Sequence, residues 1–93
     1  MAAVSDLSTV ILYSRPGCGL CDEARTLLTG LLERRRAAGL PSPTIEERDI
    51  DSDPAWQRAY FTTIPVVELG EQRLELVTSA TALRRFLDDQ LDR

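Results

Sequence analysis

The sequence predicts an α/β fold, a four-stranded mixed sheet with helices on both faces in the order β-α-β-α-β-β-α. Two observations carry this prediction. A buried strand, a long helix and a second strand follow one another, which favours a parallel pair joined by a right-handed crossover. Further along, a Gly70-Glu71 turn between two apolar runs indicates a hairpin and therefore an antiparallel pair. At 93 residues we expect one domain, 1–93, with its core at about residues 9–91.

The first strand and helix are predicted from apolar patterning. Thr9–Ser14 reads TVILYS, which is β-branched and apolar and therefore typical of a buried strand. A helix should run from about Gly19 to Ala38 and end at Gly39, a favourable C′ residue. Its last turns carry three arginines, Arg34–Arg36, which we interpret as a solvated basic helix end. The apolar residues on one face of this helix are Leu20, Ala24, Leu27, Leu28, Leu31 and Leu32.

The second half of the chain contains shorter elements. A strand with one wet face is predicted at Thr44–Ile50, followed by a short helix with Asp53 as N-cap and Pro54 as its first residue. Val66–Leu69 and Arg73–Val77 are predicted to form the hairpin strands. Thr78 or Ser79 should cap a last helix. The apolar face of that helix would be Leu83, Phe86, Leu87 and Leu91.

Composition excludes several classes of function. The net charge is −4 with no basic stripe, so we expect no nucleic-acid partner. No apolar run approaches the roughly 20 residues of a membrane-spanning helix, and Met1–Val10 does not resemble a secretory leader. We therefore expect no membrane partner. The absence of histidine rules out a Cys–His pair, a Ser–His–Asp triad and a histidine-ligated metal within one chain.

The two cysteines, Cys18 and Cys21, form a single CGLC motif. Two cysteines are too few for a disulfide-stapled secreted scaffold. A zinc site usually needs four ligands, so here it would require dimerisation or carboxylates, and we predict no metal site. The motif is then either a redox dithiol or a pair of core cysteines.

The motif's surroundings favour the redox interpretation. LYSRPGCGLCDEA lies at the first strand–helix junction, and TIPVVEL precedes the hairpin. With these features the chain resembles the thioredoxin superfamily, and most closely the small bacterial glutaredoxin-like proteins, from about Val10 to Leu91. The resemblance implies a thioredoxin-like fold and a cytoplasmic thiol–disulfide oxidoreductase.

The two cysteines should have different roles in such an enzyme. Cys18 lies at the start of the helix, where unpaired N–H groups and the helix dipole favour a thiolate nucleophile. Cys21, one turn further in, would be the shielded resolving cysteine. Asp22 and Glu23 suit the helix start but would repel a neighbouring thiolate.

Several neighbours are candidate site residues. In the family the proline matching Pro65 is cis and exposes the N–H and C=O of the residue before it, here Ile64, to an extended substrate; alternatively Pro65 only begins a strand. Arg15 could attract an anionic substrate or steady the thiolate, or could be a solvated strand-end residue. Supporting positions are Gly17, Gly19 and Tyr13, with Tyr13, Trp56 and Tyr60 interpreted mainly as packing residues.

The chain also departs from the glutaredoxin pattern. The family's glycine pair and following aspartate, which hold glutathione, are absent from Leu76–Ala80, and the first strand lacks the buried acid of many thioredoxins. We therefore expect weak glutathione binding, with a reductase or another low-molecular-weight thiol as electron donor. Substrates would be disulfide-containing proteins or small thiols. We expect a monomer without a bound cofactor.

Two other classes of function stay open. Two chains could share an iron–sulfur cluster through Cys18, together with two glutathione thiolates. Alternatively, the domain could be a binding module in which the dithiol is vestigial.

Overall fold

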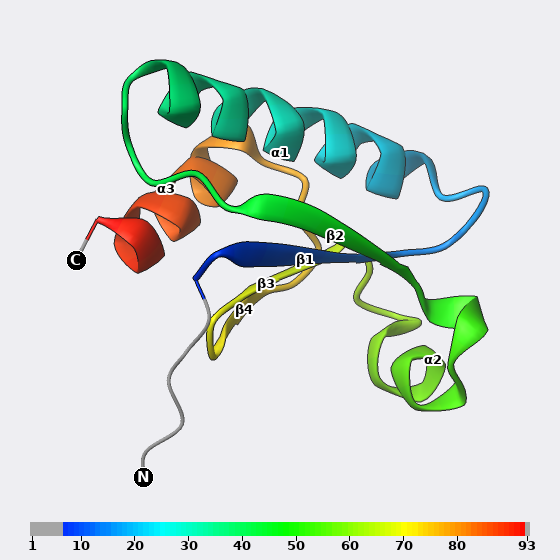
Figure 1. The fold of residues 1–93 in the computed structure, drawn as a ribbon. Helices are drawn as coiled ribbons and strands as arrows, with labels where there is room; N and C mark the ends of the chain where they lie inside the picture. Colours follow the sequence, from blue (N-terminus) through cyan, green and yellow to red (C-terminus); the bar gives the residue numbers. More distant parts are fainter. Residues whose placement is uncertain (1–6, 93) are drawn as a thin grey trace, which may run out of the picture.

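The computed structural model describes residues 7–92 and has the predicted order of elements (Figure 1). The expectation that Met1–Val10 carries no leader falls mostly outside this range. Within residues 7–92, no helix is both long and apolar enough to cross a membrane. The elements are β1 (Thr9–Ser14), α1 (Gly19–Ala37), β2 (Thr44–Asp49), a 3-10 turn (Ile50–Ser52), α2 (Pro54–Tyr60), β3 (Val66–Leu69), β4 (Gln72–Leu74) and α3 (Ala80–Leu91).

The four strands form one mixed sheet in the order β2-β1-β3-β4. β1 and β2 are parallel, with Thr9 opposite Thr44 and Ser14 opposite Asp49. β3 is antiparallel to both β1 and β4. In Figure 1, α1 and α3 lie together on one face of the sheet, and α2 lies on the other. The predicted mixed sheet with helices on both faces is therefore confirmed.

The core has two parts because successive side chains of a strand point to opposite faces. Val10 and Leu12 of β1 belong to the cluster beneath α1 and α3. Tyr13 belongs to a second cluster on the α2 side, together with Ile50, Tyr60 and Val66. The carboxyl end of β1 therefore lies between the long helix and the short one.

The structure differs from the sequence prediction on one face of α1 and at the ends of two strands. β2 ends at Asp49, because Ile50 begins the 3-10 turn. Leu20 is 47% exposed, so it does not belong to the buried face of α1, whereas Cys21 is fully buried. β4 ends at Leu74 rather than Val77. Leu76 adopts a positive φ of 50°, and the N–H groups of Leu76 and Val77 donate to the loop that precedes β3. The chain thus leaves the hairpin ladder early.

The three arginines at the end of α1 are not all solvated, contrary to the sequence interpretation. Arg34 and Arg36 are exposed, but Arg35 is 6% exposed. The Arg35 guanidinium donates to the Pro41 carbonyl at 2.7 Å, to Asp88 of α3 at 2.7 Å and to Asp92. It therefore joins the end of α1 to the end of α3. We call this set of contacts the Arg35 clamp.

Candidate functional site

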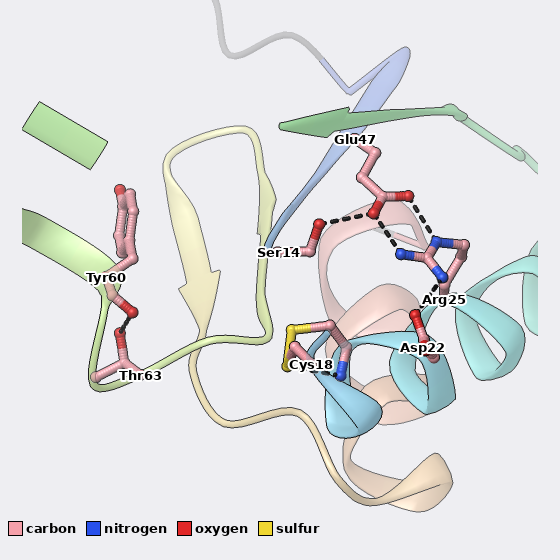
Figure 2. Close-up of a disulfide and its surroundings, with 8 residues drawn as sticks. Ser14, Cys18, Asp22, Arg25, Glu47, Tyr60 and Thr63 are labelled. Carbon is pink, nitrogen blue, oxygen red and sulfur yellow. Dashed lines mark hydrogen bonds and ion pairs between the residues drawn. A yellow bond between two sulfur atoms is a disulfide. The ribbon is translucent and has the colours of Figure 1, made fainter. Parts of the chain in front are cut away.

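The two cysteines form a disulfide at the amino end of α1, with a Cα–Cα distance of 5.2 Å (Figure 2). Cys18 is the N-cap residue and has an extended backbone, and its Sγ accepts the N–H of Cys21 at 3.1 Å. Cys18 is half-buried, whereas Cys21 is fully buried. One sulfur is therefore accessible at the end of the helix, and the other lies beneath it.

Of the two glycines that flank Cys18, only Gly17 is required by the backbone conformation of the turn. Gly17 has a φ of +78°, a conformation that side-chain-bearing residues rarely adopt. Gly19 has no such φ, and a Cβ added there would meet no atom within 4 Å. The Cys18 N–H donates to the Arg15 carbonyl at 3.3 Å, which closes the turn.

The Ile64–Pro65 peptide bond is cis, as the resemblance implied. The expectation for the Ile64 backbone is partly wrong. The Ile64 N–H donates to the Tyr60 carbonyl at 3.0 Å, because the chain continues the last turn of α2 through this point. The Thr63 hydroxyl donates to the same carbonyl, and Figure 2 shows this turn in the surroundings of the disulfide. Only the Ile64 carbonyl is therefore left for pairing with a substrate backbone.

Arg15 forms an ion pair with Asp51 at 2.9 Å, and its side chain stays 39% exposed. It lies between two surface pockets. One, of about 340 Å³, contains Asp22, Arg25 and Glu47, and the other, of about 300 Å³, contains Arg58 and Phe61. Arg15 is therefore neither fully solvated nor unpaired.

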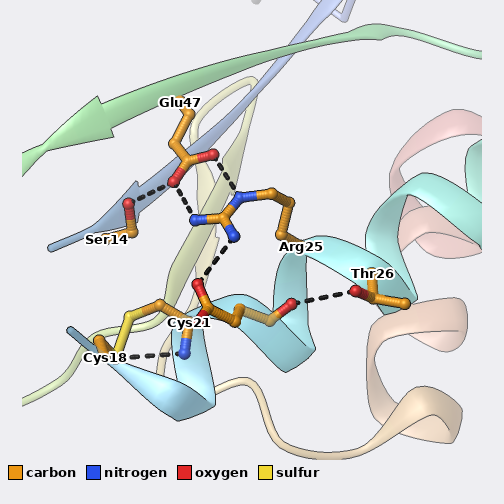
Figure 3. Close-up of polar contacts among 7 residues, drawn as sticks. Ser14, Cys18, Cys21, Arg25, Thr26 and Glu47 are labelled. Carbon is orange, nitrogen blue, oxygen red and sulfur yellow. Dashed lines mark hydrogen bonds and ion pairs between the residues drawn. A yellow bond between two sulfur atoms is a disulfide. The ribbon is translucent and has the colours of Figure 1, made fainter. Parts of the chain in front are cut away.

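Sequence reasoning missed a polar network beside the disulfide. Glu47 of β2 accepts hydrogen bonds from the Ser14 hydroxyl at 2.6 Å and from two nitrogens of Arg25 at 2.6 and 2.5 Å (Figure 3). Arg25 also donates to Asp22 at 2.8 Å (Figure 2). The only signal for this network in the sequence is the i, i+3 spacing of Asp22 and Arg25. Glu47 joins the network because β2 lies parallel to β1, a long-range pairing.

The network perturbs the titration of its members. The hydrogen bonds from Arg25 lower the pKa of Glu47; burial opposes this effect and Ser14 reinforces it. The same contacts with Glu47 and Asp22 raise the pKa of Arg25. At neutral pH, one guanidinium therefore faces two carboxylates close to the dithiol.

Glu47 should make the stability of the fold depend on pH. Its pKa is lowered by folding, so its stabilising contribution is present above the ordinary carboxyl pKa and is lost as the pH falls through the lowered value. We expect the loss of unfolding free energy in Glu47→Gln, measured with urea, to be constant between about pH 5 and 7 and to shrink below about pH 4. Glu71→Gln, at an exposed hairpin position, controls for the loss of one carboxylate. A loss in Glu47→Gln that is undiminished at about pH 3 would contradict this assignment.

Tyr13 is 3% exposed and packs against the rings of Tyr60 and Trp56, at centroid distances of 4.3 and 5.9 Å. Arg48 donates to the Tyr13 hydroxyl at 3.1 Å, and its guanidinium lies 5.1 Å from the Trp56 ring. Burial is the main cause that raises the pKa of Tyr60. Tyr13 and Tyr60 are therefore buried in the second cluster, and Trp56 packs against it. In the described part of the chain, no group of three or more potential ligands could hold a metal.

Comparisons with known proteins agree with the fold. A family model described as a glutaredoxin-like domain (DUF836) matches residues 9–92. The structural genomics target protein XcR50 from X. campestris is similar at a TM-score of 0.68 and 29% identity, over 86% of this chain and 96% of that one. No protein with a curated description matches the chain.

Two further solved structures show the same fold at lower identity. Protein Ne2328 from Nitrosomonas europaea has a TM-score of 0.64 and 20% identity, over 92% of this chain and 98% of that one. Oxidised mitochondrial thioredoxin 3 from Saccharomyces cerevisiae has a TM-score of 0.62 and 22% identity, over 87% of this chain and 76% of that one. The fold is thioredoxin-like, as predicted.

Proposed function

The chain belongs to the glutaredoxin-like domain family (DUF836), and on this premise we propose that it is a thiol–disulfide oxidoreductase that reduces disulfides in proteins or small molecules. The single observation that carries the proposal is the unequal placement of the two bonded sulfurs. Cys18 caps α1 and is half-buried, while Cys21 is fully buried one turn further in. A dithiol enzyme needs one thiol that meets the substrate and another that is shielded from it.

The capping position suits the nucleophile. The first N–H groups of a helix have no partner within the helix, and its amino end carries a partial positive charge. In the oxidised protein the Cys18 Sγ already accepts the Cys21 N–H. After reduction the same bond would stabilise a thiolate more than a neutral thiol, which lowers the pKa of Cys18.

The reaction would proceed in two exchanges. The Cys18 thiolate attacks one sulfur of the substrate disulfide, so a mixed disulfide forms and the first substrate thiolate leaves and takes a proton from water. Cys21 then gives its proton to water and attacks the Cys18 Sγ, which releases the second substrate thiolate. The substrate gains two electrons and the Cys18–Cys21 disulfide forms. An external thiol or a reductase restores the dithiol.

Substrate groups would bind around Cys18. The Ile64 carbonyl could accept a hydrogen bond from an extended substrate backbone, and Arg15, although paired with Asp51, could attract an anionic group. We propose that the enzyme acts as a cytoplasmic monomer and that the dithiol is its only redox group.

The order of alkylation tests the proposal directly. In the reduced protein, iodoacetamide at neutral pH should label Cys18 at least about tenfold faster than Cys21, because Cys18 is the more accessible and more acidic thiol. Peptide mass spectrometry after timed quenching measures both rates. In urea-unfolded protein the two rates should become similar. Faster labelling of folded Cys21 would reverse the roles, and slow labelling of both would argue against a redox dithiol.

Glutathione should be a poor electron donor. Leu76 and Val77 use their N–H groups on the Thr63 and Pro65 carbonyls, and the Ser79 hydroxyl caps α3. Leu76–Ala80 therefore offers glutathione few free hydrogen-bond donors and no carboxylate. Losing one charge-assisted contact costs roughly 10- to 100-fold in affinity. We expect low, non-saturating activity with hydroxyethyl disulfide at millimolar glutathione, and higher activity with dithiothreitol as the donor control. Efficient, saturable turnover with glutathione would contradict this expectation.

A further inference from the structure

The polar network beside the disulfide is centred on Arg25. Its guanidinium lies between Asp22, in the first turn of α1, and Glu47, on β2, and it donates to both (Figure 2). Glu47 also holds the hydroxyl of Ser14, a residue that is 3% exposed at the end of β1. Arg25 therefore links the first turn of α1 to β2. Its own side chain is 40% exposed.

The charges around this end of the molecule are mostly negative. Arg15 is already paired with Asp51, and Arg58 lies beyond it on α2. Arg25 is the cation that pairs with Asp22 and Glu47, whereas Arg48 of β2 pairs with Glu46 and lies against Tyr13 and Trp56. Among residues 7–92, the acidic side chains on α1, β2 and the 3-10 turn are Asp22, Glu23, Glu33, Glu46, Glu47, Asp49 and Asp51.

We propose that Arg25 is a positioning residue that keeps Cys18 acidic by neutralising Asp22 and Glu47. This inference rests on the proposed function, in which Cys18 attacks as a thiolate. Without Arg25, two ionised carboxylates would stand beside the dithiol and would disfavour the negative charge on sulfur. The two carboxylates would also repel each other, and the first turn of α1 would lose the hydrogen bonds that join it to β2.

The size of the effect follows from Coulomb's law in a partly solvated site. Asp22 lies one helical turn after Cys18, with its N–H bonded to the Cys18 carbonyl. An uncompensated carboxylate at roughly 6–10 Å should raise the pKa of the Cys18 thiol by about 0.5 to 1. At neutral pH the thiolate fraction should fall, so alkylation should slow by roughly two- to fivefold. The equilibrium with a reference dithiol should move toward the protein disulfide by a similar factor.

The test measures the rate of Cys18 alkylation against pH in the reduced protein. We expect Arg25→Met to raise the pH at which the alkylation rate is half-maximal. Arg25→Lys keeps the charge but not the bidentate hydrogen bonds, so it should bring this pH midpoint part of the way back to the wild-type value. Arg36→Met is the matched control, because Arg36 is exposed in the last turn, at the far end of α1. Its midpoint should equal that of the wild type.

A triple variant separates charge from structure. Arg25→Met combined with Asp22→Asn and Glu47→Gln removes the acids together with their partner, so its midpoint should return to the wild-type value or below it. The proposal is wrong if Arg25→Met leaves the midpoint unchanged, or if the triple variant is raised as much as Arg25→Met. Alkylation does not depend on turnover. A shifted midpoint in a protein that reduces no disulfide would therefore support the role of Arg25 and count only against the proposed function.

Discussion

Replacing Cys21 by serine should leave a protein that reacts once with a disulfide substrate and then stops. Cys18 can still attack, but no second sulfur is present to displace the substrate from the mixed disulfide. An attack within one molecule is equivalent to a very high thiol concentration, so turnover should fall by about 10³-fold or more. Mass spectrometry under non-reducing conditions should show one substrate thiol attached to each Cys21→Ser chain.

Cys18→Ser is the matched control, because it also leaves one thiol. Its remaining sulfur, Cys21, is fully buried. This variant should form no adduct, although its turnover should be as low as that of Cys21→Ser. Adducts on Cys18→Ser but not on Cys21→Ser would assign the nucleophile to Cys21. Full turnover in both variants would exclude a dithiol mechanism.

Removing the guanidinium of Arg35 should cause a large loss of stability. Arg35 is 6% exposed and bonds to Asp88, Asp92 and the Pro41 carbonyl. Arg35→Met keeps most of the buried stem but leaves these acceptors without their donor. Breaking a buried pair costs about 3–5 kcal/mol, and because both aspartates are partly exposed we expect about 2–4 kcal/mol here. The melting temperature should fall by roughly 10–20 °C.

The neighbouring arginines provide controls for this measurement. Arg34→Met and Arg36→Met make the same chemical change at exposed positions in the same helix turns. Their unfolding free energies in urea should stay within about 0.5 kcal/mol of the wild type. Equal losses in all three variants would indicate that helix-end charge matters and that the Arg35 clamp does not.

The fold could be predicted from the sequence because its signals are local. The apolar run at Thr9–Ser14, the helical period after it and the turn at Gly70 each indicate one element without reference to the others. The prediction failed where tertiary contacts override the pattern. Glu75–Val77 continue the strand pattern of β4, but the N–H groups of Leu76 and Val77 bond to the loop before β3 instead.

The site could be predicted as far as its residues are adjacent in sequence. Cys18, Cys21 and the Ile64-Pro65 step carry their own motif, whereas Glu47 meets Ser14 and Arg25 only through the pairing of β2 with β1. The hydrogen bond from the Ile64 N–H to the Tyr60 carbonyl depends on how the last turn of α2 ends, and no sequence motif specifies that.

The burial of Arg35 does have a signal in the sequence. It follows Leu28 and Leu32 at helical spacing, so it belongs to the buried face of α1 and not to the exposed end. An arginine at such a position needs a partner from another element. That partner could not be read from the helix itself.

The Arg35 clamp also bears on the order of folding. The pair formed with Asp92 joins residues 57 positions apart, so closing this loop has an entropic cost and we expect the pair to form late in folding. Contacts that form after the transition state leave the folding rate almost unchanged and act on the unfolding rate. The Arg35 clamp should therefore slow unfolding and extend the lifetime of the folded protein. The folding rate would depend on the local helices and strands.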